Sequence, residues 1–221
     1  MKIGNRFLSA IAGVGLAMAV AQNCQAAVLF SDNFDADSPT SVLNFNGFIN
    51  WTVDSGTVDY IRSGAFGINC AGGAGGCVDS DGSTSAAGRI VTRDTFVVPT
   101  GTSYTLSVDV SGNQRTSAED LLIFGILFEP NPGGFFAASS SCTRAGSDPF
   151  APCTLTSTFG SGLEFRVFIE GFGSDNIGAV FDNVLLTADI AQVPEPTTLV
   201  LFGVGLAGLG FRRRKRNRWK M

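Results

Sequence analysis

Carboxylates are the main side chains of this sequence that can perform acid–base chemistry, because the chain has no histidine. The lysines are Lys2, Lys215 and Lys220, all near the two ends of the chain. The long central part therefore lacks the bases of Ser-His, Cys-His and Ser-Lys mechanisms, a Schiff-base lysine and a histidine ligand for zinc. A glycosidase uses two carboxylates instead, and the glutamates available for such a pair are Glu119, Glu129, Glu164 and Glu170.

The spacing of two of these glutamates argues against a catalytic pair. Glu164 and Glu170 are an even number of residues apart in one expected strand, so they face the same side of it. At ~3.3 Å per residue they lie about 20 Å apart. A glycosidase pair needs about 5 to 10 Å. No catalytic arrangement stands out, and we expect a protein that is not an enzyme, with a glycan hydrolase as a minor alternative.

Aromatic side chains offer a different chemistry, the stacking of rings on sugars. Trp51, Tyr60 and Tyr104 are candidates, although the alternation around Trp51 favours a place in the core. Phe135 and Phe136 lie in a stretch from 131 to 153 that we expect to be a long surface loop. They are therefore the candidate residues for an exposed ligand contact.

One acidic segment begins like a calcium-binding loop. It reads Asp79-Ser80-Asp81-Gly82, but the twelfth position counted from Asp79 is Ile90 and not a glutamate. The segment is thus not an EF-hand, and a solvated turn is the expectation.

Short runs of valine, threonine and phenylalanine alternate with polar residues throughout the central part, which is typical of half-buried strands. The expected strands are Val28–Phe34, Phe48–Val53, Thr57–Arg62, Gly88–Val98, Tyr104–Ser111, Leu121–Glu129, Leu163–Glu170 and Ala179–Thr187. Glycine- and serine-rich links separate them, and no window has a helical period. The pattern predicts an all-β protein with a jelly-roll-like β-sandwich.

The N-terminus has the order of a secretory signal peptide. Lys2 and Arg6 precede an apolar run over residues 7–21, and the small residues Ala26 and Ala27 follow. This order of charge, apolar segment and small-residue exit predicts a signal peptide over residues 1–27.

Four cysteines lie beyond that signal peptide, whereas Cys24 lies within it. An even number of cysteines in an exported domain predicts disulfides, and their spacing does not match zinc sites. Short loops favour Cys70 with Cys77 and Cys142 with Cys153 among the three possible pairings.

The C-terminus combines three features in direct succession. Val193-Pro194-Glu195-Pro196 is followed by an apolar segment over 197–211 and by a basic tail over 212–221 that begins Arg212-Arg213-Arg214. As a helix the apolar segment is about 22 Å long, short for a hydrocarbon core of about 30 Å. It predicts a single short transmembrane helix, with the basic tail kept in the cytoplasm. A nucleic-acid or nuclear-localisation patch is also basic, but it requires a soluble tail.

This arrangement resembles the PEP-CTERM sorting signal of Gram-negative bacteria, over residues 193–221. The resemblance implies processing near Pro194-Glu195-Pro196 by an exosortase, a membrane protease-transpeptidase, and a link to extracellular polysaccharide. The helix would lie first in the inner membrane, and the ectodomain, residues 28–192, would then reach the cell surface or the biofilm matrix.

Charge is distributed unevenly along the chain. All 19 acidic residues lie between Asp32 and Glu195 with only six arginines among them, so this segment has a net charge of −13. Such a surface repels nucleic acid and anionic polymers unless cations intervene. It suits an exported domain that takes up calcium.

The two ends of the ectodomain carry a second resemblance. Ser31-Asp32-Asn33-Phe34-Asp35 and Ala179-Val180-Phe181-Asp182-Asn183-Val184-Leu185-Leu186 look like the first and last strands of jelly-roll carbohydrate-binding modules. By that resemblance Asp35 and Asp182 would hold a structural calcium, an ion that prefers several hard oxygen ligands. Alternatively, both residues cap strands and accept hydrogen bonds from turns.

The resulting expectation is a structural or adhesive protein of the cell surface or matrix, sorted by an exosortase. A lectin-like carbohydrate-binding module and a carboxylate-dependent glycan hydrolase are the alternatives.

Overall fold

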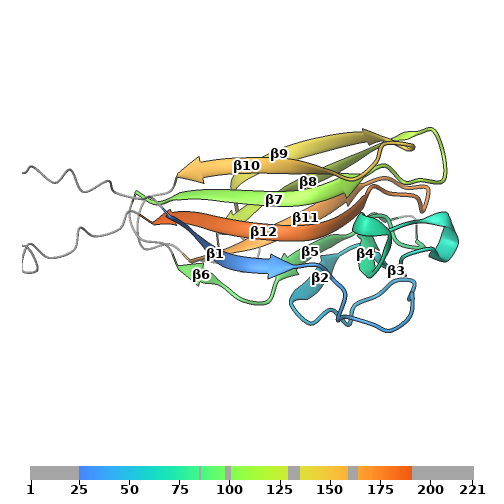
Figure 1. Cartoon of the computed structure of the whole chain (residues 1–221), viewed down its shortest axis with the longest axis horizontal. Coiled ribbons are helices and arrows are strands. Elements are labelled where there is room, and N and C mark those ends of the chain that lie inside the picture. Colours follow the sequence, from blue (N-terminus) through green and yellow to red (C-terminus); the bar gives the residue numbers. More distant parts are fainter. Residues whose placement is uncertain (1–24, 85, 98–100, 129–134, 159–163, 191–221) are drawn as a thin grey trace, which may run out of the picture. The chain divides into compact units, whose positions relative to one another are not determined.

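The structure of the chain is a computed structural model, and it describes residues 25–84, 86–97, 101–128, 135–158 and 164–190. Two six-stranded sheets make up this part of the chain, and every pairing between their strands is antiparallel (Figure 1). Helix is limited in these residues to two short 3₁₀ turns, Ala65–Gly67 and Ala71–Gly73. The expected all-β fold is thus confirmed.

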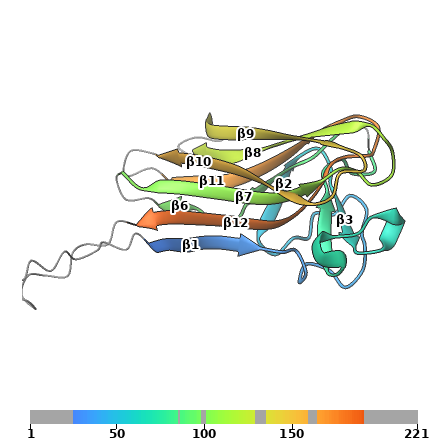
Figure 2. The same ribbon diagram turned by 45° about the horizontal axis from the view of Figure 1, so that its top comes forward.

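The first sheet is built around β12. Its order is β10 (Ala151–Thr158), β7 (Ser103–Ser111), β12 (Val180–Ile190), β4 (Gly76–Asp79) and β3 (Asp59–Arg62), with β1 (Gln25–Asp32) also paired to β12. One side of β12 pairs with β7, whereas the other side pairs first with β4 and then with β1. In Figure 2 the blue strand β1 runs alongside the orange strand β12.

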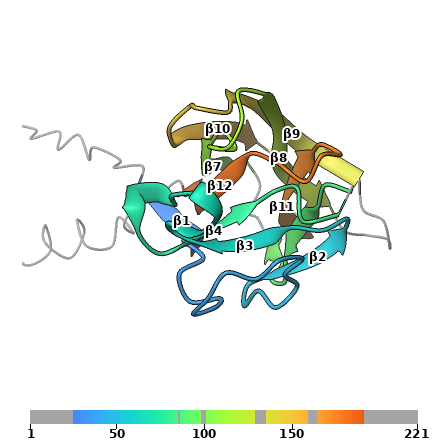
Figure 3. The ribbon, with the colours of Figure 1, turned by 90° about the vertical axis from the view of Figure 1, so that its right-hand side faces the viewer.

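The second sheet has a matching plan around β11. Its order is β2 (Trp51–Ser55), β5 (Arg89–Thr92), β11 (Glu164–Phe172), β8 (Glu119–Phe128) and β9 (Phe135–Ala145), with β6 (Phe96–Val97) also paired to β11. One side of β11 pairs with β8 along its whole length, and the other side pairs with β5 and β6. Figure 3 views the end of the domain where the turns between β3 and β4 lie.

Alternate residues of the two sheets form one shared apolar core. Leu106 and Val108 of β7 are fully buried, and so are Leu122 and Phe124 of β8. Successive side chains of a strand point to opposite faces of its sheet, so the buried set of each strand faces the other sheet. The result is a β-sandwich.

Trp51 lies in this core, as the alternation predicts. It is fully buried, its ring stacks against Phe34 at 5.9 Å, and it meets Phe30 edge-on at 5.4 Å. The indole Nε1–H donates a hydrogen bond of 2.9 Å to Oδ2 of Asp32. Tyr60 and Tyr104 are also buried, so these three aromatic side chains form no exposed platform for a sugar.

The expectation of a long surface loop over residues 131–153 is wrong. Residues 135–145 form β9, and β10 begins at Ala151. Both are edge strands, so one edge of each strand has no neighbouring strand and is open to water. Small polar residues are tolerated there. Pro152 fits this position because an edge strand has backbone N–H groups that need no partner.

A disulfide joins these two edge strands across the sandwich. Cys142 of β9 bonds to Cys153 of β10, and the two strands belong to different sheets. Cys142 belongs to the core cluster, and Cys153 packs against that cluster. The pairing is the one that short loops favour, and it ties the two sheets together at one edge.

The two terminal signals lie outside the described residues, as does the helix expected over 197–211. In the part of the chain that is described, no helix has the length and apolar character to cross a membrane. Strand β1 begins at Gln25, so Ala26 and Ala27 pair with Asp189 and Ala188. Cleavage after Ala27 would leave residues 28–32 to hold β1 in the sheet.

The Asp32 carboxylate should be a strong local contributor to stability. It accepts hydrogen bonds from the Trp51 indole, the Asn50 side chain and the Phe34 amide. Asp32→Ala leaves these donors without an acceptor, so we expect it to lower the free energy of unfolding by about 2–3 kcal/mol. Urea unfolding measures the loss.

Asp54→Ala is the matched control. Asp54 pairs with Arg89 at 2.8 Å, and both side chains are about a third or less exposed. A surface pair of this kind contributes at most about 1 kcal/mol. Equal losses in the two variants would contradict the role assigned to Asp32.

Candidate functional site

Asp182 lies where β12 exchanges one neighbour for another. Val180 and Phe181 pair with β4, and pairing with β1 begins at Val184. Between these two stretches the register with β7 shifts, and Asn183 has a positive φ of 47°. Asp182, which is 3% exposed, still pairs with Asp109 of β7 and is the last residue before this shift.

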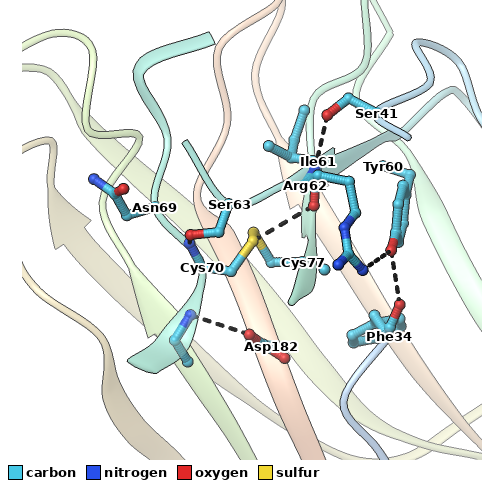
Figure 4. Close-up of a disulfide and its surroundings, with 12 residues drawn as sticks. Phe34, Ser41, Tyr60, Ile61, Arg62, Ser63, Asn69, Cys70, Cys77 and Asp182 are labelled. Atoms are coloured by element: carbon cyan, nitrogen blue, oxygen red, sulfur yellow. Dashed lines mark hydrogen bonds between the residues drawn. A yellow bond between two sulfur atoms is a disulfide. The ribbon is translucent and has the colours of Figure 1, made fainter. Parts of the chain in front are cut away.

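The loop closed by the Cys70–Cys77 disulfide packs against this interruption (Figure 4). The backbone N–H of Ala71 donates a hydrogen bond of 3.1 Å to Oδ2 of Asp182. Near the other end of the loop, the N–H of Gly76 donates one of 2.8 Å to Oδ1 of Asp35. The two carboxylates thus hold the two ends of one disulfide-closed loop, and this disulfide pairing too is the expected one.

A tyrosine and an arginine hold the segment that carries Asp35. The buried Tyr60 hydroxyl lies 3.1 Å from the carbonyl oxygen of Phe34 and 3.0 Å from that of Ser38. Nη1 of Arg62 donates to the Tyr60 hydroxyl and to the carbonyl oxygen of Asp35. Figure 4 shows this chain of contacts from Arg62 through Tyr60 to Phe34.

Burial raises the pKa of Asp182 to about 7, against the opposing effect of the amides of Asn183 and Ala71. The negative charges of Asp35 and Asp109 raise this pKa further. Both carboxylates accept hydrogen bonds from the same disulfide-closed loop, and the calcium expected between them stays a prediction. The alternative to a calcium site is that Asp35 and Asp182 cap turns, and their hydrogen bonds from amides of the loop agree with this alternative. Among the described residues, no three acidic, cysteine or histidine side chains are placed to hold a metal ion.

A polar groove of about 700 Å³ lies next to this site. It runs over β1, β12 and β7, and its polar lining includes Ser31, Asp32, Asn50, Ser107, Asp109 and Asn183. Asn183 donates a hydrogen bond of 3.0 Å to Asp109. The volume is that of a small-ligand site, and the lining offers hydroxyl, amide and carboxylate groups to a hydroxyl-rich ligand.

The sequence reasoning missed this groove. Asp32 and Asn183 belong to the two segments that resemble carbohydrate-binding modules, which was the available signal. Asp109 and Ser107 come from β7, and only the pairing of β7 with β12 brings them into the groove. Phe135 and Phe136 lie on β9 by their backbone, and their side chains are outside the description.

Two of the glutamates expected as hydrolase candidates, Glu164 and Glu170, lie on the same strand but do not come together. Glu164 pairs with Val97 and Glu170 with Arg89, at opposite ends of β11. Glu119 is exposed at the start of β8, and Glu129 lies outside the described residues. The separation of Glu164 and Glu170 is as the sequence predicts.

Residues 192–215 match the model of the PEP-CTERM protein-sorting motif. The chain carries a PEP-CTERM sorting motif. The match includes Val193-Pro194-Glu195-Pro196, the apolar segment and Arg212-Arg213-Arg214. The resemblance noted from these residues is thus confirmed, and the chain is an exported protein that is sorted through its C-terminus. No curated protein matches the PEP-CTERM chain in sequence.

Carbohydrate-binding modules are among the solved structures that are similar to this chain. The CBM22-1–CBM22-2 tandem domain of Paenibacillus barcinonensis Xyn10C matches with a TM-score of 0.50 and 16% identity, covering 77% of this chain and 47% of that one. The CBM22-1 xylan-binding domain of the same protein gives 0.49 and 15%, covering 76% and 97%. At such identity the likeness of the tandem domain shows the fold alone, a sandwich of the carbohydrate-binding-module type.

A multidomain enzyme is a further match. The CBM22-1–GH10 modules of Clostridium thermocellum endo-1,4-beta-D-xylanase 10B give a TM-score of 0.48 and 13% identity. The alignment covers 76% of this chain and 30% of that one. The PEP-CTERM chain therefore spans less than a third of this enzyme and less than half of the tandem domain.

The contact between the disulfide loop and Asp35 can be tested with two glycines of the same backbone conformation. Gly75 (φ 75°) and Gly72 (φ 71°) both require a left-handed residue. A Cβ at Gly75 would collide with the Asp35 carboxylate, whereas one at Gly72 would meet nothing within 4 Å. Gly72→Ala should destabilise by about 1–2 kcal/mol through backbone strain alone.

Gly75→Ala should cost about 1–3 kcal/mol more than Gly72→Ala, because the carboxylate must leave the Gly76 amide. Urea unfolding of both variants measures the difference. Equal destabilisation would show that Asp35 does not hold the loop.

Proposed function

We propose that this chain is a non-catalytic protein of the cell surface or extracellular matrix that adheres to extracellular polysaccharide. The observation that supports it is the combination of a PEP-CTERM sorting motif with a sandwich of the carbohydrate-binding-module type. The groove over β1, β12 and β7 is the candidate contact surface, because it is open and rich in hydrogen-bonding groups.

The route to the surface follows from the two terminal signals. The signal peptide directs the chain through the inner membrane of a Gram-negative cell, and the segment over 197–211 stops there. The arginines after it stay in the cytoplasm by the positive-inside rule. An exosortase then cuts near Pro194-Glu195-Pro196 and releases the ectodomain, residues 28–192, to the surface or matrix.

Calcium at Asp35 and Asp182 is part of this proposal. A cation there would offset the mutual repulsion of two carboxylates that are held beside one loop. It would also lower the negative potential next to the groove. In a lectin-like module, the alternative that the groove favours, such a cation would fix the loop beside the ligand.

Groove variants test the binding of polysaccharide. We expect the full chain, purified in detergent, to sediment with the producing organism's extracellular polysaccharide and to leave the polymer length unchanged. Ser107→Ala/Asp109→Ala removes two polar groups of the groove and should weaken binding at least about tenfold, the effect of losing about 1.4 kcal/mol. Asp94→Ala/Ser117→Ala, which changes two exposed residues elsewhere, should bind as the unaltered chain does.

The outcomes separate the alternatives. Shortened polymer would favour the hydrolase, whereas calcium-dependent binding with unchanged polymer length would support the adhesive or lectin-like role. No binding with or without calcium would contradict the polysaccharide role and leave a structural coat protein.

Two tail variants test the sorting step. Glu195→Ala changes the recognition tripeptide, and deletion of residues 212–220 removes the cytoplasmic charges. Both should leave export intact but retain the unprocessed chain at the membrane. Mass spectrometry of the surface fraction measures this, with Gln192→Ala as the control. A trimmed mass in both variants would show that the motif is not read as proposed.

A further inference from the structure

A second group of acidic residues lies at the end of β4 that is far from Gly76. Asp79 ends this strand, and Ser80 and Asp81 follow it. All three are at most 1% exposed. They pack beneath residues 173–178, which connect β11 to β12, because a Cβ at Gly178 would lie 2.6 Å from Ser80 Oγ.

Several acidic side chains of this region have polar partners. Asp79 forms a salt bridge with Arg115 and accepts hydrogen bonds from the amides of Asp81 and Gly178. Asp120 accepts a bond of 2.7 Å from Asn113. Backbone amides, the side-chain amide of Asn113 and one arginine thus stabilise these carboxylates.

Asp81 differs from them. Its side chain is fully buried, yet neither carboxylate oxygen accepts a hydrogen bond. Burial is the main cause that raises the pKa of Asp81, and the negative charges of Asp175 and Asp120 raise this pKa further. The backbone amides of Asp175 and Asn176 lower it, although they form no hydrogen bond of normal geometry with the carboxylate. No arginine is among the charges that act on it. A buried carboxylate in this position needs a cation or a proton.

The glycine at position 173 keeps a small space open between two carboxylates. A Cβ there would lie 2.5 Å from Oδ2 of Asp81 and 3.8 Å from Oδ1 of Asp175. Ser80 directly precedes Asp81 in the sequence, and its Oγ is also buried without a hydrogen bond. Asp175 is exposed, so its side chain can turn toward this space.

We propose that Asp81 and Asp175 bind a calcium ion at this end of β4, at a site separate from Asp35 and Asp182. Calcium accepts six to eight oxygen ligands at flexible geometry, which suits two carboxylates from different loops. In the described part of the chain no third carboxylate is placed to join them. The remaining ligands would be backbone carbonyl groups and water.

The ion would add a link between two connections that are already joined by hydrogen bonds from Ser80 to Ala179 and from Gly178 to Asp79. Asp81 belongs to the connection after β4, and Asp175 belongs to the connection between β11 and β12. Each connection passes from one sheet to the other, so a bound ion would tie these two crossovers to each other at this end of the sandwich. The competing state is a neutral Asp81 that holds a proton and binds no metal.

Calorimetric calcium titration and thermal unfolding of the full chain, in detergent after chelator treatment, test the site. We expect calcium to raise the midpoint of unfolding of the unaltered chain. Asp81→Asn keeps the shape of the side chain but removes its charge, so it should fold and should lose one bound calcium per chain. Asp175→Asn, at an exposed position, should weaken the same binding event at least tenfold.

Two controls assign the binding to this site. Asp94→Asn removes an exposed negative charge elsewhere and should bind calcium as the unaltered chain does. Asp182→Asn should leave the event that depends on Asp81 unchanged. If the number of bound ions and the unfolding midpoint are the same in the unaltered chain and Asp81→Asn, or if calcium binds to neither, Asp81 holds a proton and the proposal is overturned.

Discussion

The hydrogen bonding of β12 is the constraint on which most of this structure depends. One side of this strand is occupied by β7, and the other side is divided between β4 and β1. Two strands cannot meet end to end on one edge without a break in the ladder, and the break falls at Asp182 and Asn183. A buried carboxylate is tolerated there because the Asn183 and Ala71 amides donate to it.

The same break determines where functional groups can gather. Asn183 turns toward Asp109 at the groove, while Asp182 faces the loop from Cys70 to Cys77. The loop is short, closed by its disulfide and held at both ends by carboxylates, so its backbone cannot move away independently.

The sequence predicted most strands but missed the edge strands β9 and β10 and the short inner strand β4. Tyr104–Ser111 alternates strictly because β7 has one face in the core, and the structure places the strand at Ser103–Ser111. Strand β9 carries alanine and serine over much of its length, and its sequence pattern predicts a loop. The groove was beyond prediction, because Asp109 and Asn183 become neighbours only when distant strands pair. The sorting motif, by contrast, is contiguous and is readable without a fold.

Positive charge is scarce in this domain, and the arginines are largely committed to the backbone. Arg93 donates to the carbonyl of Phe48, and Arg144 donates to those of Val110 and Ala151. Only two salt bridges to carboxylates occur among the described residues, those of Arg89 and Arg115. The buried Asp79 pairs with Arg115, whereas the buried carboxylates of Asp59, Asp120 and Asp182 accept hydrogen bonds from amides instead. A domain of this charge repels anionic polymers unless cations intervene, so the proposed calcium sites and the proposed adhesion to polysaccharide depend on the same scarcity of positive charge.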